Sequence, residues 1–451
     1  MDKYLSETIT LIKTNLPTHS YLREVVFLDK IHEIKAYQVL DSRGNPTIKV
    51  VIKTKKHIGY AFVPSGASTG LYEAVELRDN KKAYNGKGVE KTVDIINKKI
   101  NKQLKGIKVT EQEEVDLELK RLDATENKSK IGANTILGVS LAVSRAAAQA
   151  KDKELYEYLA ELFKNKKKLM LPIPQANVLN GGEHAGNYLK FQEFLLIPTG
   201  AKSFAEAMRM VGETYHVLKK IIDDKFGINA TNVGDEGGFA PPIRTPEEAL
   251  ELVSEAITKA GYKRKIRIGM DVAASSLYNE NEYDIGVSFS AKGLTSYYDR
   301  LFSKYDIKSI EDPFEQDDNE AWQEFMNTVA KKRRVQVVGD DLTVSNPHRV
   351  RRAINNNLCN AIILKPNQIG TLTETLKAAE MAFDAGWEVI VSHRSGDTED
   401  TYISDLAVGI GASQIKLGAP CRGERTSKYN RLIEIEANLK KKGYAGKKVK
   451  F

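Results

Sequence analysis

The sequence predicts an α/β fold, in which a smaller α+β region is followed by a barrel of alternating strands and helices. The barrel is predicted because short apolar strands from residue 266 onward end in charged residues that recur every 23 to 40 positions. This spacing is typical of βα units, whose strand ends meet on one face of a barrel. The preceding region is predicted by a three-strand pattern and then by helical periodicity, both before residue 168.

Three strands are expected near the start of the smaller region. Residues 31–53 read as two strands joined by Asp-Ser-Arg-Gly-Asn-Pro at 41–46, a dense turn signal, and residues 58–63 supply the third strand. The run Pro-Ser-Gly-Ala-Ser-Thr-Gly at 64–70 is too rich in glycine and hydroxyl groups for regular structure. It predicts a mobile flap that closes on a polar ligand. Helical periodicity then dominates residues 88–164.

These patterns divide the chain into three segments. Residues 1–30 mix charge with scattered leucine and isoleucine and predict an N-terminal extension, in which Pro17 should end any first helix. Residues 31–168 are expected to form the α+β domain. Residues 169–451 are expected to form the barrel, because the best boundary is Leu-Pro-Ile-Pro at 171–174.

Composition bounds the class of protein. The chain has 451 residues, of which 41% are hydrophobic, so it can bury a substantial core. Its two cysteines, Cys359 and Cys421, are far apart and lack metal-ligand spacing, which argues against a disulfide framework and a structural zinc site. No apolar run approaches the roughly 20 residues that span a bilayer, and residues 1–30 lack the apolar core of a signal peptide. A cytoplasmic protein without membrane insertion is therefore expected.

The chain is basic, since lysine and arginine exceed aspartate and glutamate by 68 − 60 = 8 residues. Many of the basic residues gather at 164–168, at 331–334 and from 440 onward, without the interleaved aromatic residues of a platform for single-stranded nucleic acid. Such charge is usually a solvated lysine-rich surface. Nucleic acid is therefore not the expected main partner.

Charged residues stand at the ends of consecutive predicted strands. In a parallel barrel these ends converge on the face that holds active sites, so carboxylates, amines and a guanidinium are expected in one pocket. One such residue would be an ordinary loop charge, but six strand ends in succession indicate a site. The strand-end residues are Asp271, Glu311, Asp340, Lys365, the pair His393 and Arg394, and Lys416.

Three of these strand ends predict a metal site. Asp271, Glu311 and Asp340 offer hard oxygen donors at consecutive strand ends. This set suits Mg²⁺, which binds a few carboxylates, keeps some waters and completes its octahedron with substrate oxygens. Three carboxylates placed close together would also raise one another's pKa unless a cation neutralised them.

Six motifs resemble those of the enolase family, in order and at family-like spacing, from about residue 31 to about residue 436. Each motif is moderately specific, whereas the six together are very specific. They are Asp-Ser-Arg-Gly-Asn-Pro-Thr at 41–47, Val-Pro-Ser-Gly-Ala-Ser-Thr-Gly at 63–70, Gly-Asp-Glu-Gly-Gly-Phe-Ala-Pro at 234–241, Gly-Met-Asp-Val-Ala-Ala-Ser at 269–275, Ile-Glu-Asp-Pro-Phe at 310–314 and Ser-His-Arg-Ser-Gly-Asp-Thr-Glu-Asp at 392–400.

The resemblance implies an enolase-like modified (β/α)8 barrel with an N-terminal α+β domain made of a three-stranded meander and helices. It also implies a glycolytic lyase that reversibly dehydrates 2-phospho-D-glycerate to phosphoenolpyruvate and water. Enolase-superfamily enzymes are an established example of a Lys or His base working with one or two Mg²⁺ ions. Two Mg²⁺ per active site are implied, the second arriving with substrate. Asp271, Glu311 and Asp340 match ligands of the first, and Ser42 matches a partial ligand of the second.

The same resemblance assigns the catalytic residues. Lys365 matches the base, and Glu236 matches the acid that protonates the departing hydroxyl, with Glu193 nearby. The base must be neutral, so its pKa is expected to fall from ~10.4 to ~7 or 8 beside Mg²⁺ and Lys416. Pro366 is expected to hold Lys365 in an extended conformation. Two carboxylates that share a site raise one pKa, which is expected to keep the acid protonated.

Matched substrate contacts complete the implied site. Arg394 and Ser395 match the phosphate contacts, and a planar guanidinium suits phosphate oxygens. His393 is either a neighbour of the ligand or a hydrogen-bonded residue at a strand end. The other matched positions are Lys416 for the substrate carboxylate, the loop residue His184, Gln192, and the flap residues Ser65 and Ser68.

Other interpretations stay open. An enzyme with the same metal and base could act on an unphosphorylated hydroxy acid, although Arg394, Ser395 and the flap favour a phosphate. The family is also associated with plasminogen binding at cell surfaces and with RNA-processing assemblies, for which the basic tail at 440–451 is the candidate. That role would place the protein at the cell surface, or secreted without a signal peptide, as well as in the cytoplasm. The resemblance further implies a homo-oligomer, either a dimer or an octamer.

Overall fold

The computed structural model describes residues 29–66, 69–165, 168–439, 443–446 and 449. Most of the expected extension at 1–30 lies outside the described residues, as do Ser68 and most of the basic tail. Within the described part of the chain, no helix is both long enough and apolar enough to cross a membrane.

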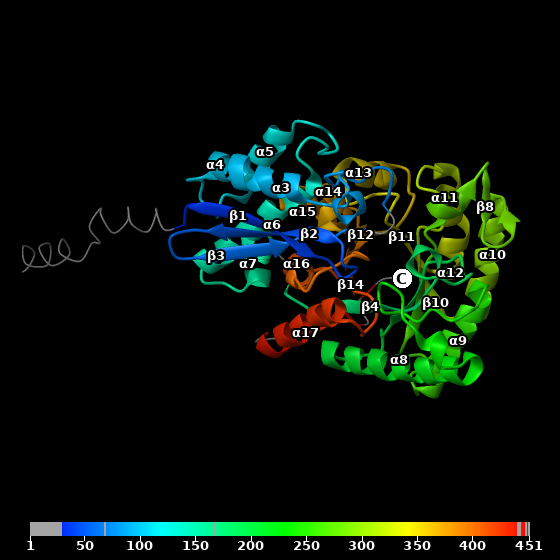
Figure 1. Ribbon diagram of the computed structural model, residues 1–451. Coiled ribbons are helices and arrows are strands. Elements are labelled where there is room, and N and C mark those ends of the chain that lie inside the picture. Colours follow the sequence, from blue (N-terminus) through cyan, green and yellow to red (C-terminus); the bar gives the residue numbers. More distant parts are fainter. Residues whose placement is uncertain (1–28, 67–68, 166–167, 440–442, 447–448, 450–451) are drawn as a thin grey trace, which may run out of the picture.

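The first region contains a three-stranded antiparallel sheet in the order β1–β2–β3, drawn in blue in Figure 1. Its strands are β1 (Glu33–Leu40), β2 (Pro46–Lys53) and β3 (Ile58–Phe62). The register pairs Leu40 with Pro46 and Lys53 with Ile58, so short turns join the strands. The three predicted strands are therefore confirmed.

Helical segments complete this region, and some of them pack on the sheet. They are η1 (Ala83–Gly86), α3 (Glu90–Asp94), η2 (Ile95–Ile100), α4 (Asn101–Leu104), α5 (Gln112–Asp123), α6 (Ala133–Ala150) and α7 (Leu155–Leu162). Helix α6 is rich in alanine and packs closely on β2 and β3. The contact is tight at Gly59, where a Cβ atom would lie 2.1 Å from the carbonyl oxygen of Ala142. Small side chains therefore set the distance between helix and sheet.

The second region is a closed eight-stranded barrel, with strand order β10–β11–β12–β13–β14–β4–β5–β6. The strands are β4 (Ile173–Asn180), β5 (Glu193–Ile197), β6 (Arg267–Asp271), β10 (Ile307–Glu311), β11 (Gln336–Gly339), β12 (Ala361–Leu364), β13 (Glu388–Ser392) and β14 (Gln414–Lys416). Most of their residues are buried, as expected for strands covered by helices. The predicted barrel is confirmed.

One barrel strand runs in the opposite direction to the rest. Strand β5 is antiparallel to β4 and β6, whereas the other neighbouring pairs are parallel. The first residue of β5, Glu193, consequently lies opposite Asn180 and Asp271, which are the last residues of β4 and β6. Residues 181–192 form a hairpin loop at this end of the barrel and include η3 (Gly182–His184).

Helices surround the barrel, as Figure 1 shows. They are α8 (Phe204–Phe226), η4 (Ile228–Thr231), α9 (Pro246–Lys259), η5 (Ala274–Leu277), α10 (Ala291–Lys304), α11 (Asn319–Phe325), η6 (Met326–Ala330), α12 (Lys331–Arg333), α13 (Pro347–Asn355), α14 (Pro366–Ile369), α15 (Leu372–Asp384), α16 (Tyr402–Ile410) and α17 (Gly423–Asn438). A small sheet of β7 (Tyr278–Asn279), β8 (Glu282–Asp284) and β9 (Ser288–Phe289) lies between β6 and α10 in sequence.

Candidate active site

A small polar cavity lies at the barrel face where the strand ends meet. It encloses about 20 Å³, roughly the room of one water molecule. A larger cavity of about 770 Å³, beside α5 and α15, contains none of the predicted site residues. The small cavity is lined by His184, Gln192, Glu193, Glu236, Asp271, Asp340, Lys365, Ser392, His393, Arg394, Ser395 and Lys416. Most of the residues singled out in the sequence are therefore brought together.

Lys416, the last residue of β14, is the centre of an acidic cluster. Its Nζ atom lies 3.0 Å from Glu193 Oε2, 3.0 Å from Asp271 Oδ2 and 2.8 Å from Glu311 Oε2. Burial disfavours the charged amine, but these carboxylates outweigh it and raise the pKa of Lys416 well above its usual value. The lysine is therefore a buried cation that holds three strand-end carboxylates together.

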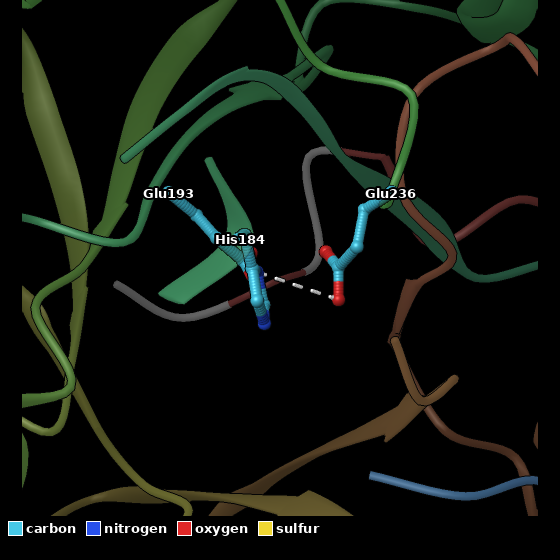
Figure 2. A group of neighbouring side chains, drawn as sticks. All are labelled: His184, Glu193 and Glu236. Atoms are coloured by element: carbon cyan, nitrogen blue, oxygen red, sulfur yellow. Dashed lines mark ion pairs between the residues drawn. The ribbon is translucent and has the colours of Figure 1, made fainter. Parts of the chain in front are cut away.

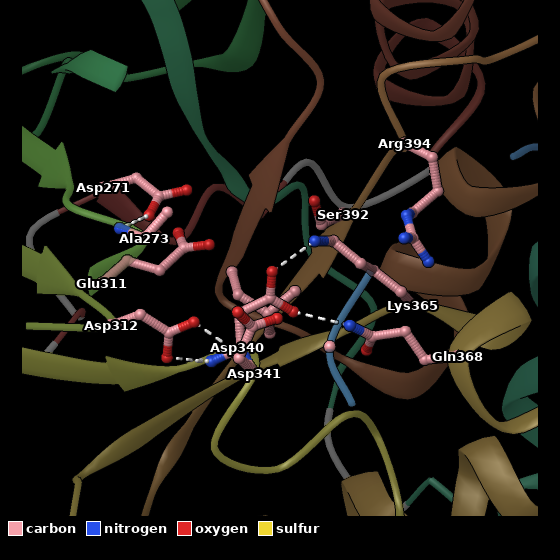
Figure 3. Close-up of polar contacts among 12 residues, drawn as sticks. Asp271, Ala273, Glu311, Asp312, Asp340, Asp341, Lys365, Gln368, Ser392 and Arg394 are labelled. Carbon is pink, nitrogen blue, oxygen red and sulfur yellow. Dashed lines mark hydrogen bonds and ion pairs between the residues drawn. The ribbon is translucent and has the colours of Figure 1, made fainter. Parts of the chain in front are cut away.

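Lys365 forms a second buried ion pair (Figure 3). Its Nζ donates to Asp340 Oδ2 at 2.5 Å, and Gln368 Nε2 donates to Asp340 Oδ1 at 2.8 Å. The backbone of Lys365 is extended, at φ −121° and ψ 106°, as expected of a residue that precedes proline. Burial works against its charge, yet Asp340 outweighs burial, so the pKa of Lys365 is raised. The expected lowering of this pKa depends on nearby Mg²⁺ and stays a prediction.

The predicted metal ligands lie at neighbouring strand ends, although their contacts differ. Asp271 is opposite Glu311 in the ladder of β6 and β10, and both contact Lys416, whereas Asp340 contacts Lys365. Carboxylate oxygens of Asp312, Asp340 and Asp341 also lie within 4.8 Å of one another. Two lysine cations thus stand among several buried carboxylates, and such a set of hard oxygen donors fits a divalent cation.

The expected mutual effect of crowded carboxylates is present. Burial and the nearby Asp271 raise the pKa of Glu311 well above its usual value. Burial and Asp340 raise the pKa of Asp341 to about 7. Added positive charge would relieve both effects, which is the electrostatic demand that a metal ion would meet.

Glu236 and Glu193 both lie close to the buried His184 (Figure 2). The Nδ1 atom of His184 is 3.6 Å from Glu193 Oε1 and 3.7 Å from Glu236 Oε1. Glu236 Oε2 accepts a hydrogen bond of 3.1 Å from Asn177 Nδ2 and lies 3.2 Å from His393 Nε2. The two carboxyl groups therefore share one buried environment, linked by an imidazole.

The contacts of His393 fix its tautomer. Arg425 Nη1 is 2.6 Å from His393 Nδ1, and because a guanidinium can only donate, Nδ1 must be the acceptor. The ring proton is then on Nε2, which faces Glu236. Burial lowers the pKa of His393 to about 4, so the ring is neutral near pH 7. His393 is hydrogen-bonded at a strand end and also lines the cavity, so both roles considered for it stay open.

The carboxyl group with the raised pKa is Glu193, not Glu236. Burial and the charge of Glu236 raise the pKa of Glu193 well above its usual value. Burial opposes the charge of Glu236 as well. His393 and His184 outweigh the effect of burial and hold the pKa of Glu236 well below its usual value. The expectation that the shared site keeps Glu236 protonated is therefore wrong in this structure, because hydrogen-bond donors surround Glu236 rather than Glu193.

The matched phosphate contacts also lie in the cavity. Arg394 is buried and pairs with Glu73 through two hydrogen bonds, from Nη1 at 2.8 Å and from Nη2 at 3.1 Å. The Ser395 hydroxyl donates to Glu236 Oε1 at 3.3 Å and lies 2.9 Å from His184 Nε2. Gln192 Nε2 reaches Asp271 Oδ2 at 3.4 Å.

Two predicted serines of the described residues, Ser42 and Ser65, do not line the cavity. The Ser42 hydroxyl donates to the carbonyl oxygen of Ser395 at 3.3 Å and accepts from the amide of Asp397 at 3.2 Å. The Ser65 hydroxyl donates to Glu76, and the Ser65 backbone pairs with Gly396. Ser42 therefore ties the first region to the loop after β13. Ser68 lies outside the described residues.

Several residues around the site were not predicted, and three examples show why. Asn177 binds Glu236 from inside β4, Glu73 binds Arg394 from a loop, and Arg425 holds His393 from α17. Polar residues within a fully buried strand, such as Asn177 in β4, are a usable signal only once the burial of that strand is known. Glu73 and Arg425 carry no comparable local signal, because charged residues are common in loops and on helices.

The fold and the site together define a barrel enzyme in which buried carboxylates, two buried lysines and an arginine face one small cavity. The family model "Enolase, N-terminal domain" matches residues 31–159, and "Enolase, C-terminal TIM barrel domain" matches residues 168–451. An enolase of Mastigamoeba balamuthi is 52% identical over 426 residues, which cover 91% of this chain and 96% of that protein. The chain belongs to the enolase family and is a lyase of the phosphopyruvate hydratase type.

Proposed function

We propose that this chain catalyses the reversible, Mg²⁺-dependent dehydration of 2-phospho-D-glycerate to phosphoenolpyruvate and water, as a step of glycolysis. The observation that carries the proposal is that one cavity holds Lys365, Glu236 and Arg394 beside the acidic cluster. A proton acceptor, a proton donor and a phosphate contact are the groups that this elimination needs.

Asp271, Glu311 and Asp340 are the proposed ligands of the first Mg²⁺, and Ser42 is a proposed partial ligand of a second one that arrives with substrate. The ions would bind the substrate carboxylate and neutralise the negative charge that builds up on it when the α-proton leaves. Hard oxygen donors at adjacent strand ends support this assignment.

Lys365 is the proposed base. It must be neutral to accept the α-proton, but Asp340 now holds it in the charged form. Asp340 would hold the metal ion, and Lys365 would then lose its carboxylate partner. Arg394 and Lys416 remain as positive neighbours, and both lower the pKa of Lys365. Lys365 would thereby become the neutral amine that the reaction requires.

Glu236 is the proposed acid for the departing hydroxyl, with Glu193 as its partner. The pKa of Glu236 is low in the free chain, but a substrate that carries a phosphate and a carboxylate adds negative charge nearby. Negative charge raises the pKa of a carboxyl group and favours its protonated form. Glu193, whose pKa is already raised, would keep a proton in the same buried environment.

The remaining cavity residues are proposed to bind substrate. Arg394 and Ser395 would hold the phosphate, and Lys416 would hold the carboxylate. A cavity of about 20 Å³ cannot contain a phosphorylated three-carbon acid, so the site must widen on binding. The other proposed substrate contacts are His184, Gln192, Ser65 and Ser68.

The reaction is tested by following the ultraviolet absorbance of phosphoenolpyruvate as it forms from 2-phosphoglycerate, with and without Mg²⁺. We expect a Mg²⁺-dependent signal that falls by about 10²–10⁴-fold in Lys365→Ala, because a positioned proton acceptor contributes about that factor. Lys377→Ala, which removes an exposed lysine, should keep full activity.

Two outcomes would contradict the proposal. A folded, Mg²⁺-loaded chain without any signal would mean that the site has another substrate or a non-catalytic role. Equal turnover of an unphosphorylated hydroxy acid would favour the alternative enzyme that shares the metal and the base. Full activity of Lys365→Ala would leave the reaction in place but remove Lys365 as the base.

We further propose two domains, at 31–168 and 169–451, with residues 1–30 as an extension, in a cytoplasmic homo-oligomer that is a dimer or an octamer. The separate sheet and barrel support the division.

Plasminogen binding at the cell surface is a second candidate role, motivated by the basic tail. Unchanged plasminogen binding after deletion of residues 440–451 would remove the tail as its cause.

A further inference from the structure

The guanidinium of Arg394 is already bound by an anion that belongs to the chain itself. Glu73 accepts two parallel hydrogen bonds from it, through Oε2 at 2.8 Å and Oε1 at 3.1 Å. Asn367 Oδ1 accepts a further bond from Nη1 at 3.2 Å. Both charged side chains are at least nine-tenths buried, with exposures of 4% for Arg394 and 9% for Glu73. Carboxylates and phosphates bind arginine through the same paired geometry.

Glu73 is held in this position by its own loop. Its Oε1 atom accepts from the amide of Gly70 at 3.1 Å, and its amide donates back to the Gly70 carbonyl at 3.1 Å. The next residue towards the N-terminus, Tyr72, donates to Asp317 at 2.7 Å, and its ring lies 3.8 Å from the guanidinium carbon of Arg349. The contacts of Tyr72 thus anchor the loop to the barrel next to Glu73. The Glu73 carboxylate therefore lies against Arg394.

We propose that Glu73 is a positioning residue that acts as an internal, displaceable ligand of the phosphate-binding arginine. This inference rests on the proposed function, in which Arg394 binds the substrate phosphate. In the free chain Glu73 neutralises and orients the buried guanidinium. On binding, the phosphate replaces the carboxylate, and the Gly70 amide remains as a hydrogen-bond donor to Glu73.

The exchange favours a phosphate because of its charge and its number of acceptor atoms. A phosphate monoester carries about −1.5 to −2 charges near pH 7 and offers three acceptor oxygens, whereas Glu73 offers one charge and two oxygens. An internal competitor raises the apparent dissociation constants of all anions at Arg394 by one common factor, because it lowers the population of free guanidinium. Weakly held anions then stay unbound at concentrations where the substrate binds.

The test compares Glu73→Gln with the native chain by calorimetric titration of inorganic phosphate and by steady-state kinetics with 2-phosphoglycerate. Loss of a charged hydrogen-bonded pair should tighten phosphate binding by about tenfold. The KM for 2-phosphoglycerate should fall by the same factor while kcat stays unchanged, because Glu73 would be displaced in both the bound state and the transition state. Tyr72→Phe is the matched control, since it loosens the same loop without removing the contact to Arg394.

Two results would overturn the inference. Weaker phosphate binding in Glu73→Gln, restored in Glu73→Asp, would show that Glu73 only orients Arg394 and stays in place. Equal tightening in Tyr72→Phe would assign the effect to the loop rather than to the carboxylate. Because phosphate titration needs no turnover, tightening without any activity on 2-phosphoglycerate would preserve this inference while the proposed function fails.

Discussion

Individual residues at this site satisfy opposing electrostatic demands. Burial disfavours the charge of Asp340, but Lys365 outweighs burial and lowers the pKa of that carboxyl group. Glu311 keeps a raised pKa even though it contacts Lys416. Glu193 has a raised pKa, because burial and the charge of Glu236 outweigh its contact with Lys416. Burial and a neighbouring negative charge both favour the protonated form of a carboxyl group. Neighbouring carboxyl groups therefore reach different protonation states through their local partners.

The buried imidazole of His393 predicts an acid-sensitive stability. Its pKa is about 4 in the folded chain, against 6.5 for an ordinary histidine, so between these values only the unfolded chain binds the proton. Neutral His393 does not reduce the free energy of unfolding above pH 6.5. As pH falls from 6.5 towards 4, the free energy of unfolding decreases, and the total loss is about 3 kcal/mol. His393→Gln should remove that part of the pH dependence in urea unfolding at pH 7, 5 and 4.

The exposed His348 provides the matched control, because His348→Gln leaves the buried site intact. It should show the same acid dependence as the native chain. Identical slopes for His393→Gln and the native chain would show that another group causes the loss of stability in acid.

At the residue scale, the sequence predicts positions better than protonation states. Asp271, Asp340 and Lys365 could be placed because each follows a short apolar strand, and barrel geometry brings such ends together. The direction of a pKa shift depends on contacts across the barrel, such as Asp340 with Lys365. Those contacts join residues 25 positions apart or more and cannot be read from a local pattern. The expectation for Glu236 was therefore wrong, while that for Lys365 beside Mg²⁺ stays a prediction.

At the scale of elements, close packing of α6 on β3 is a consequence of small side chains. A Cβ atom at Gly59 would lie 2.1 Å from the Ala142 carbonyl oxygen and 2.4 Å from the Ala146 amide nitrogen. Both are backbone atoms, so a rotamer change cannot relieve the clash. The helix would have to move away from the sheet.

Gly59→Ala should therefore destabilise the chain by about 1–3 kcal/mol, the usual cost of overpacking. Gly212→Ala is the matched substitution, because Gly212 lies within α8 and a Cβ atom there meets nothing within 4 Å. It should stabilise the chain by up to ~1 kcal/mol through helix propensity. Urea unfolding measures both changes, and a loss of stability in both variants would indicate that something other than packing decides the outcome.

The direction of β5 could not be predicted from the sequence. Its residues, Glu193–Ile197, are a short apolar run that would suit either direction in a covered sheet. The direction follows from the hairpin at 181–192 and from pairing with β6, which is more than 70 residues further along the chain. The order of strands and helices was readable because it depends on local pattern, whereas this pairing depends on the closed barrel.

For the whole molecule, the acidic cluster predicts that Mg²⁺ binding and stability are linked. A ligand that binds only the folded chain stabilises it by about 2.7 kcal/mol at 100 times its dissociation constant. Removing Mg²⁺ with a chelator should lower the melting temperature and abolish activity. Asp340→Asn should lose most of the Mg²⁺-dependent increment, because a proposed ligand is gone.

The stability gained on adding Mg²⁺ is measured by calorimetry for each variant separately, with and without Mg²⁺. The loss of the ion pair between Asp340 and Lys365 then affects both measurements equally. Glu380→Gln removes an exposed carboxylate and should keep the full increment. An undiminished increment in Asp340→Asn would place the stabilising ion elsewhere.

The pairing of β14 with β4 also matters while the chain is being made. These strands join residue 173 to residue 414, so 414 − 173 = 241 residues of synthesis separate the two partners. At a synthesis rate of 5–20 residues per second, one edge of β4 stays unpaired for roughly 10 to 50 s. An unpaired edge is a template for aggregation. A chain interrupted before β14 therefore leaves the ribosome with an unclosed barrel, and the last strand decides whether a nascent molecule needs protection by a chaperone.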